Sequence, residues 1–177
     1  MNRFEKVKAC LKMLGYTSLS SENFEDKLVI QKIVYLIQLK GMRTGYAFNL
    51  YVRGPYSPDL TSDIYEHSEE LEHLDSHDGL SDVEQRYVEE FKKTIELKPS
   101  QLEVAATYSY FAFELGNDAI SSTAKVREMK GFYPEAQIAL GISRAKQLFF
   151  KPTKQELDSL KAEATLWENA SETDVKD

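Results

Sequence analysis

Three histidines, His67, His73 and His77, lie in a strongly acidic part of the chain and are the first residues that could support chemistry. His73 and His77 are four residues apart, a spacing that can place two imidazoles on one helix face as metal ligands. However, Gly79 and the neighbouring aspartates favour a loop, and the chain contains no His-Glu-x-x-His pattern. We therefore expect a solvated loop and no cofactor, with a metal site at His73 and His77 as the alternative.

The single cysteine, Cys10, is the other candidate for reactivity. It lies among the apolar residues of a predicted helix, so we expect a buried structural thiol and not a nucleophile. One cysteine also excludes an intramolecular disulfide and favours a reducing compartment. The chain has no phosphate-binding loop, dinucleotide fingerprint or nucleophile elbow, and Ser57 is explained as a helix N-cap. These observations favour a protein that is not an enzyme.

Tyr51, Arg53 and Tyr56 cluster around one predicted strand and turn. Tyrosine and arginine are enriched among the residues that dominate binding energy at protein interfaces. The cluster therefore predicts a partner-binding surface. The structural alternative is that Tyr56 packs under the turn while Arg53 pairs with a carboxylate.

Hydrophobic periodicity predicts a mainly α fold. Helices are expected over residues 3–14, 24–40, 58–72, 82–97, 101–115, 118–129, 134–148 and 153–168. Residues 47–53 alternate like a half-buried strand, and Gly54-Pro55 predicts a turn after it. The expected architecture is a multi-helix globular domain with a small β element, whose helix–strand–turn–helix order is winged-helix-like.

Residues 24–40 are apolar nearly all round, which predicts a central helix covered on several sides. Its only expected polar face is the stripe Lys27, Gln31, Tyr35 and Gln38, for which we favour hydrogen bonds to neighbouring backbone. A later aromatic run, residues 108–113, could stack nucleic-acid bases. Its helical spacing between small residues favours core packing instead.

We divide the chain into one helical domain, residues 1–150, and a C-terminal part, residues 151–177. In that part we expect a helix whose Leu157, Leu160 and Trp167 pack back, followed by a disordered acidic tail from residue 169. No stretch approaches the roughly 18 apolar residues of a membrane span. The N-terminus lacks the continuous apolar core of a signal peptide. We therefore expect a soluble, cytoplasmic protein.

The formal charge of −7 at pH 7 hides a strong polarisation along the chain. Residues 59–96 hold three bases and thirteen acids, whereas residues 121–154 hold seven bases and two acids. Net acidity argues against a constitutive DNA binder, whose affinity depends on neutralising phosphates. A nucleic-acid-binding alternative depends on the basic residues Lys125, Arg127, Lys130, Arg144, Lys146 and Lys151.

Two segments give the chain a family resemblance. The first segment is KLVIQKIVYLIQ, in which the matching residues are Lys27, Leu28, Gln31, Lys32, Tyr35 and Gln38. The second is the turn with Gly54, Pro55, Tyr56, Ser57, Pro58 and Leu60. Together with residues 102–111 and 119–148, they resemble the YwgA-like group and, more distantly, the SocA-like or Panacea antitoxin domain. The resemblance implies a mostly helical fold with a small β element and, for Panacea domains, an antitoxin that neutralises a toxin, often in phage defence.

The sequence therefore predicts a non-catalytic protein-binding module, an antitoxin or a component of phage defence or anti-defence. The predicted partner-binding residues are Tyr51, Arg53, Tyr56, Ser57, Glu69, Glu70 and Glu72. The acidic residues would cover a basic surface of a toxin by charge complementarity. The alternatives are a winged-helix-like nucleic-acid-binding regulator and an enzyme with an unrecognised site around the three histidines. We expect no membrane partner, and the oligomeric state is left open.

Overall fold

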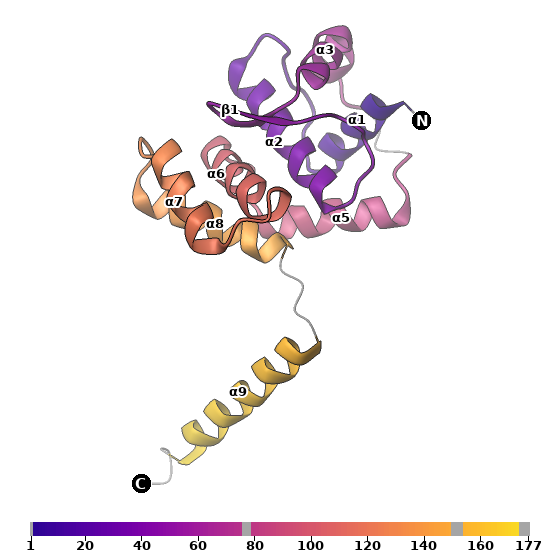
Figure 1. Cartoon of the computed structure of the whole chain (residues 1–177). Coiled ribbons are helices and arrows are strands. Elements are labelled where there is room, and N and C mark those ends of the chain that lie inside the picture. Colours follow the sequence, from indigo (N-terminus) through magenta and orange to yellow (C-terminus); the bar gives the residue numbers. More distant parts are fainter. Residues whose placement is uncertain (1, 76–78, 150–153, 174–177) are drawn as a thin grey trace.

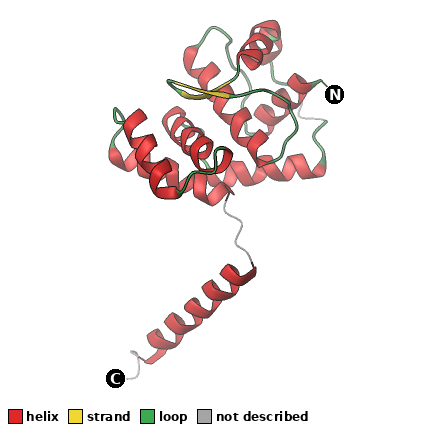
Figure 2. Cartoon of the chain, viewed as in Figure 1, coloured by secondary structure: helices red, strands yellow, loops and turns green. Residues whose placement is uncertain are grey.

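Helices make up most of the computed structural model, which describes residues 2–75, 79–149 and 154–173 (Figure 1). The helices are α1 (Arg3–Met13), α2 (Phe24–Lys40), α3 (Pro58–Glu66), α4 (Ser68–Glu72), α5 (Asp82–Thr94), α6 (Pro99–Ser109), α7 (Ala119–Met129), α8 (Glu135–Phe149) and α9 (Lys154–Thr173). A π-helical turn, η1 (Tyr110–Glu114), continues α6. Strands β1 (Asn49–Tyr51) and β2 (Gly54–Tyr56) form an antiparallel hairpin (Figure 2). The predicted mainly helical fold with a small β element is confirmed.

Local capping explains where several helices begin. The side chain of Asn23 accepts a hydrogen bond from the backbone N–H of Asp26 at the start of α2. Ser81 and Glu84 form a reciprocal capping box at the start of α5. Such caps satisfy backbone donors that have no partner inside the helix, and each contributes roughly 1 kcal/mol.

Helices α2 and α6 form the centre of the domain. All residues from 28 to 37 in α2 and from 101 to 109 in α6 are buried. Helix α2 packs on α3, α5, α6 and β2, whereas α6 packs on α7, α8, η1 and β2. The prediction of a central helix over residues 24–40 is confirmed. Of the aromatic run, Tyr108 and Phe111 lie in the core, as predicted, and Phe113 is partly exposed.

The hairpin differs from the predicted strand and turn. Val52 and Arg53 form the turn, and Gly54 and Pro55, expected to turn, belong to β2. Gly54 opens β2 with a φ of 93°, which glycine adopts without the steric cost of a Cβ. Val52 lies at the tip and is 83% exposed, so the alternation of a half-buried strand predicted over residues 47–53 fails there.

Helix α9 also differs from the prediction. Figure 1 shows it apart from the other helices, and Trp167 is 73% exposed, so the expectation that this side chain packs back was wrong. The side chains of Leu157 and Leu160 lie outside the described part of the chain. The helix continues over residues 169–173, where disorder was expected, because this stretch lacks glycine and proline. Residues 174–177 lie outside the described residues.

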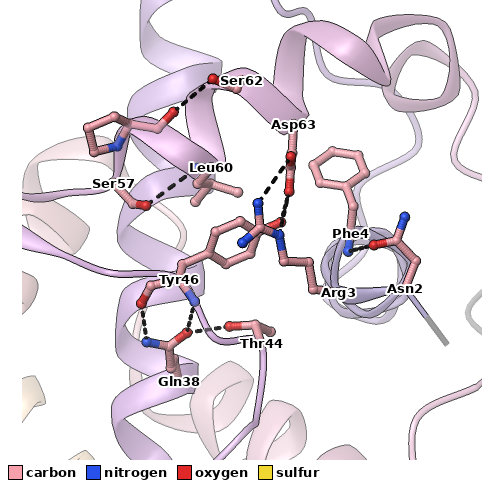
Figure 3. Close-up of polar contacts among 11 residues, drawn as sticks. Asn2, Arg3, Phe4, Gln38, Thr44, Tyr46, Ser57, Leu60, Ser62 and Asp63 are labelled. Atoms are coloured by element: carbon pink, nitrogen blue, oxygen red, sulfur yellow. Dashed lines mark hydrogen bonds and ion pairs between the residues drawn. The ribbon is translucent and has the colours of Figure 1, made fainter.

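A polar cluster fastens α1 to α3 and to the loop before the hairpin (Figure 3). Arg3 Nε donates to Asp63 Oδ2 at 2.8 Å, and the Tyr46 hydroxyl donates to the same oxygen at 2.6 Å. The Arg3 guanidinium also lies 4.3 Å from the centre of the Tyr46 ring. Burial alone would raise the pKa of Asp63, but the two hydrogen bonds and the Arg3 charge outweigh it and hold that pKa below its usual value.

Acidification is therefore expected to remove the contribution of Asp63 to stability. Because its folded-state pKa lies below the unfolded value of about 3.9, the contribution is complete above that value and is lost as the pH falls through the folded-state pKa. We expect Asp63→Asn to lower the free energy of unfolding by about 1–3 kcal/mol at pH 7 and by less at pH 3, measured by urea unfolding. Asp59→Asn, at an exposed position of the same helix, is the control. An equal loss at both pH values would contradict the prediction.

Candidate partner-binding surface

Two glutamines of α2 hold the chain on either side of the hairpin. The Gln31 amide donates to Ser57 O and accepts from Ser57 N, both at 2.9 Å. The Gln38 amide pairs in the same way with Tyr46, donating to its carbonyl at 2.8 Å and accepting from its N–H at 3.1 Å (Figure 3). The predicted hydrogen bonding of this stripe to backbone is confirmed for both glutamines but was wrong for Lys27 and Tyr35, which donate to the side chains of Tyr65 and Glu114. These bonds fix residues 46 and 57, and hence the hairpin between them, against the central helix.

The hairpin also lies directly on buried groups of α2 and α6. The Lys32 ammonium donates to Pro55 O at 2.7 Å, and burial lowers the pKa of Lys32 to about 7, although the Glu103 charge opposes this. A Cβ added to Gly54 would lie 2.5 Å from Thr107 Oγ1, so only glycine permits this approach. The polar stripe was predicted to be the only polar face of α2. Lys32 lies outside that stripe, and its buried ammonium bonds to β2, so α2 has a second polar contact.

A charged cluster lies beneath the turn and centres on Glu103 of α6. Glu103 Oε1 accepts from Lys130 at 2.7 Å, and Oε2 accepts from Arg53 at 2.8 Å and from the Tyr133 hydroxyl at 2.9 Å. Lys130 also donates to Val52 O at 3.0 Å. Glu103 and Lys130 are fully buried, whereas the Arg53 side chain is 44% exposed. Burial lowers the pKa of Lys130, and the Glu103 carboxylate opposes that shift. The cluster therefore ties the turn, α6 and the end of α7 together.

A groove of about 430 Å³ opens beside the hairpin, between the start of α2 and helix α3; we call it the hairpin groove. Its aromatic lining residues are Phe24, Tyr51, Tyr56 and Tyr65. Its cationic lining residues are Lys27, Lys32 and Arg53. No aspartate or glutamate is among its lining residues, all of which lie in the described part of the chain. The groove therefore combines apolar walls with charged lining residues that are all basic, one of which, Arg53, pairs with Glu103 beneath the turn.

Exposed apolar side chains extend this surface beyond the groove. Phe24 is 63% exposed and Phe132 is 62% exposed, and the Arg53 guanidinium lies 5.6 Å and 5.9 Å from the centres of their rings. Cation–π contacts at these distances orient the arginine while leaving part of it accessible. Exposed aromatic groups gathered around an arginine are a typical binding surface.

The four predicted residues of the turn have different environments. Tyr51 and Arg53 are accessible and line the groove. Tyr56 is partly buried, its ring lies 5.1 Å from that of Tyr51, and its hydroxyl accepts from Thr61. Ser57 is fully buried and caps α3, which leaves its side chain no access to a partner. The structural alternative, in which Arg53 pairs with a carboxylate, is also confirmed, because Arg53 pairs with Glu103.

The predicted acidic residues lie elsewhere, around a hollow between α1 and α4 that is lined by Glu5, Lys8, Glu69, Glu70, Glu72 and His73. Glu70 pairs with Lys8 and with His67, and these hydrogen bonds lower its pKa. Glu69 and Glu72 are exposed and form no ion pair with another described residue. This acidic surface is distinct from the hairpin groove, since the two share no lining residue.

The predicted basic residues do not all lie on the surface. Lys130 is fully buried against Glu103, so it cannot contact a phosphate and was wrongly grouped with the others. Arg127 pairs with Glu135 at 2.6 Å. Lys125 and Lys146 lie over the rings of Phe111 and Tyr108. Arg144 donates to Gln147 at 3.3 Å. Lys151 lies outside the described residues.

The remaining chemical candidates are also placed. Cys10 is buried, and burial raises the pKa of its thiol, in agreement with the predicted structural role. His73 is exposed, and His77 lies outside the described residues. Among residues 2–75, 79–149 and 154–173, no group of three or more His, Cys, Asp or Glu side chains could hold a metal ion. No helix in this part of the chain is long and apolar enough to span a membrane.

Sequence reasoning missed Glu103 and Tyr133, together with the contributions of Phe24 and Tyr65 to the groove. A signal for Glu103 was present, because it is the only charged residue in residues 99–113. A lone charge inside an apolar, buried helix requires a partner.

No family model, curated protein or solved structure matches this chain.

Proposed function

We propose that this protein is a non-catalytic protein-binding module that binds its partner through the hairpin groove. The observation that carries the proposal is the exposed set of aromatic side chains around Arg53, on a hairpin fixed from below. Exposed apolar groups in contact with one another favour association with another protein. Trp, Tyr and Arg are the residues that most often dominate such interfaces.

The rigid support of the hairpin favours the same function. Binding costs less free energy when the interface is already ordered, because fewer side chains and loops lose freedom on association. Here Gln31 pairs with Ser57, Lys32 donates to Pro55 and Glu103 holds Arg53. The hairpin is therefore presented to a partner in one conformation.

An antitoxin-like or defence-related role is the form of this function that the family resemblance suggests. Its toxin, or another defence-system protein, would occupy the groove. The acidic surface with Glu69 and Glu72 offers a second contact for a basic region of that partner.

Substituting alanine for Tyr51 is expected to weaken partner binding by about 30-fold or more, the effect typical of an interface hot spot. The test is to tag the full chain, recover it from its native cells with and without nuclease treatment, identify the stoichiometric partner, and measure the affinity of each variant. Ile120→Ala is the control, because Ile120 is also an exposed apolar side chain but lies on α7, outside the groove.

Two results would contradict the proposal. One is recovery of nucleic acid without a protein partner, which would favour the nucleic-acid-binding alternative. The other is equal affinity of Tyr51→Ala and the unmodified chain for the recovered partner. Urea unfolding of each variant separates a lost contact from a lost fold.

A further inference from the structure

We propose that the hairpin groove also binds helix α9 of a second copy of this chain, so that two copies exchange their C-terminal helices. This inference rests on the proposed function in one respect, since both assign binding to the same groove. It adds an occupant of stated chemistry: an acidic helix with an aromatic anchor.

Helix α9 has the features of such an occupant. Leu166 and Trp167 are 69% and 73% exposed, although Trp167 is the only tryptophan of the chain. Residues 154–173 contain two lysines and five acidic residues, so the helix is negatively charged. An exposed tryptophan on a charged helix that extends from the domain is expected to find an apolar surface.

The hairpin groove offers this helix aromatic walls and positively charged side chains. Its walls include the rings of Phe24, Tyr51 and Tyr65, which offer edge-to-face contacts to an indole. Of its three cations, Arg53 is already paired with Glu103 beneath the turn, whereas Lys27 donates to the Tyr65 hydroxyl and has no carboxylate among the lining residues. Carboxylates of α9 would face Lys27 and the exposed part of the Arg53 guanidinium.

The arrangement of the chain favours a second copy over the same one. Figure 1 shows α9 extending from the domain on the side away from the hairpin. Its 20 residues form a helix of roughly 30 Å, long enough to reach a neighbouring molecule. Two copies can exchange such helices about a twofold axis, each contributing one groove and one helix.

The single tryptophan makes the test direct. The fluorescence of Trp167 in the full chain is measured over a wide range of protein concentration, alongside sedimentation analysis. We expect solvent-exposed emission from dilute monomer, and a blue shift that develops with concentration together with a dimer. Added salt is expected to weaken the dimer, because the contact pairs opposite charges.

Variants locate the contact. Trp167→Ala is expected to weaken dimerisation by about 30-fold or more in sedimentation analysis. Glu163, one helical turn before Trp167, lies on the same face of α9, so Glu163→Lys is also expected to weaken it. Tyr51→Ala tests the groove, and Ile120→Ala is the control that should leave the dimer unchanged. The α9 variants do not alter the domain core, so a change in dimerisation cannot be attributed to unfolding of the domain.

Three outcomes would overturn the inference. They are a monomer with exposed Trp167 emission at every concentration, a blue shift independent of concentration, and a dimer that Tyr51→Ala leaves intact. The second would place α9 on its own domain. The affinity of Trp167→Ala for the external partner distinguishes failure of this inference from failure of the proposed function. If that variant binds the partner normally and Trp167 never docks, only this inference fails. If the partner binds Tyr51→Ala as tightly as the unmodified chain, the proposed function fails instead.

Discussion

Replacing Glu103 with glutamine is expected to lower the free energy of unfolding by about 3–5 kcal/mol. Glu103 is the acceptor for Lys130, Arg53 and Tyr133, and its side chain is fully buried. Without the carboxylate, the Lys130 ammonium stays fully buried with no opposite charge beside it. An uncompensated buried charge is far more costly than the loss of one hydrogen bond. Urea unfolding at pH 7 measures the effect as a lower midpoint with an unchanged slope.

The exposed pair of Arg127 and Glu135 provides the matched control. Its side chains are 55% and 64% exposed, so Glu135→Gln is expected to change stability by only about 0–1 kcal/mol. The double variant Glu103→Gln, Lys130→Met removes both buried charges and should recover part of the loss. A loss below 1 kcal/mol in Glu103→Gln alone would mean that the cluster does not hold the turn.

The helices of this protein could be predicted because their signals are local. Asn23 and Ser81 are N-caps at the positions where α2 and α5 begin. The run of apolar residues in α2 indicated burial on all sides, and every residue from 28 to 37 is buried. Capping and periodicity depend only on neighbours along the chain, so one sequence is enough to read them.

The hairpin turn could not be placed in the same way. Gly54 and Pro55 form a common turn pair, and this pair outweighed the weaker turn preference of Val52 and Arg53. What places the turn at residues 52 and 53 is tertiary: Lys130 donates to Val52 O, Glu103 accepts from Arg53, and Lys32 donates to Pro55 O. These partners come from α2, α6 and the residue that follows α7, and their positions follow only from the packing of helices distant in the sequence.

The candidate site was predicted in part for the same reason. Tyr51 and Arg53 could be identified because residue type alone predicts their use at interfaces. Phe24 and Tyr65 lie on other elements, α2 and α3, and join them only through the packing of these helices around the hairpin. Ser57 was assigned both to a cap and to a partner surface, and its burial leaves only the cap.

Gly54→Ala is expected to lower the free energy of unfolding by about 2–4 kcal/mol, for two separable reasons. The φ of 93° is strained for any residue with a Cβ, at roughly 1–2 kcal/mol. The new Cβ would also lie 2.5 Å from Thr107 Oγ1, an overpacking cost of about 1–3 kcal/mol. Because Thr107 lies in a fully buried helix, the hairpin has to move, and Arg53 moves with it. We therefore also expect weaker partner binding than stability alone would explain.

The chain provides a control that separates the two contributions to this loss. Gly45 has a φ of 73° and no atom within 4 Å of an added Cβ, so Gly45→Ala isolates the backbone strain. Thr107→Ala removes the clashing hydroxyl, so Gly54→Ala should cost less in that background than alone. Urea unfolding of the unmodified chain, the three single variants and the Gly54→Ala, Thr107→Ala double variant gives both comparisons. Equal losses at Gly54 and Gly45 would mean that β2 is free to shift on α6, and the hairpin would then not be the rigid platform on which the proposed binding depends.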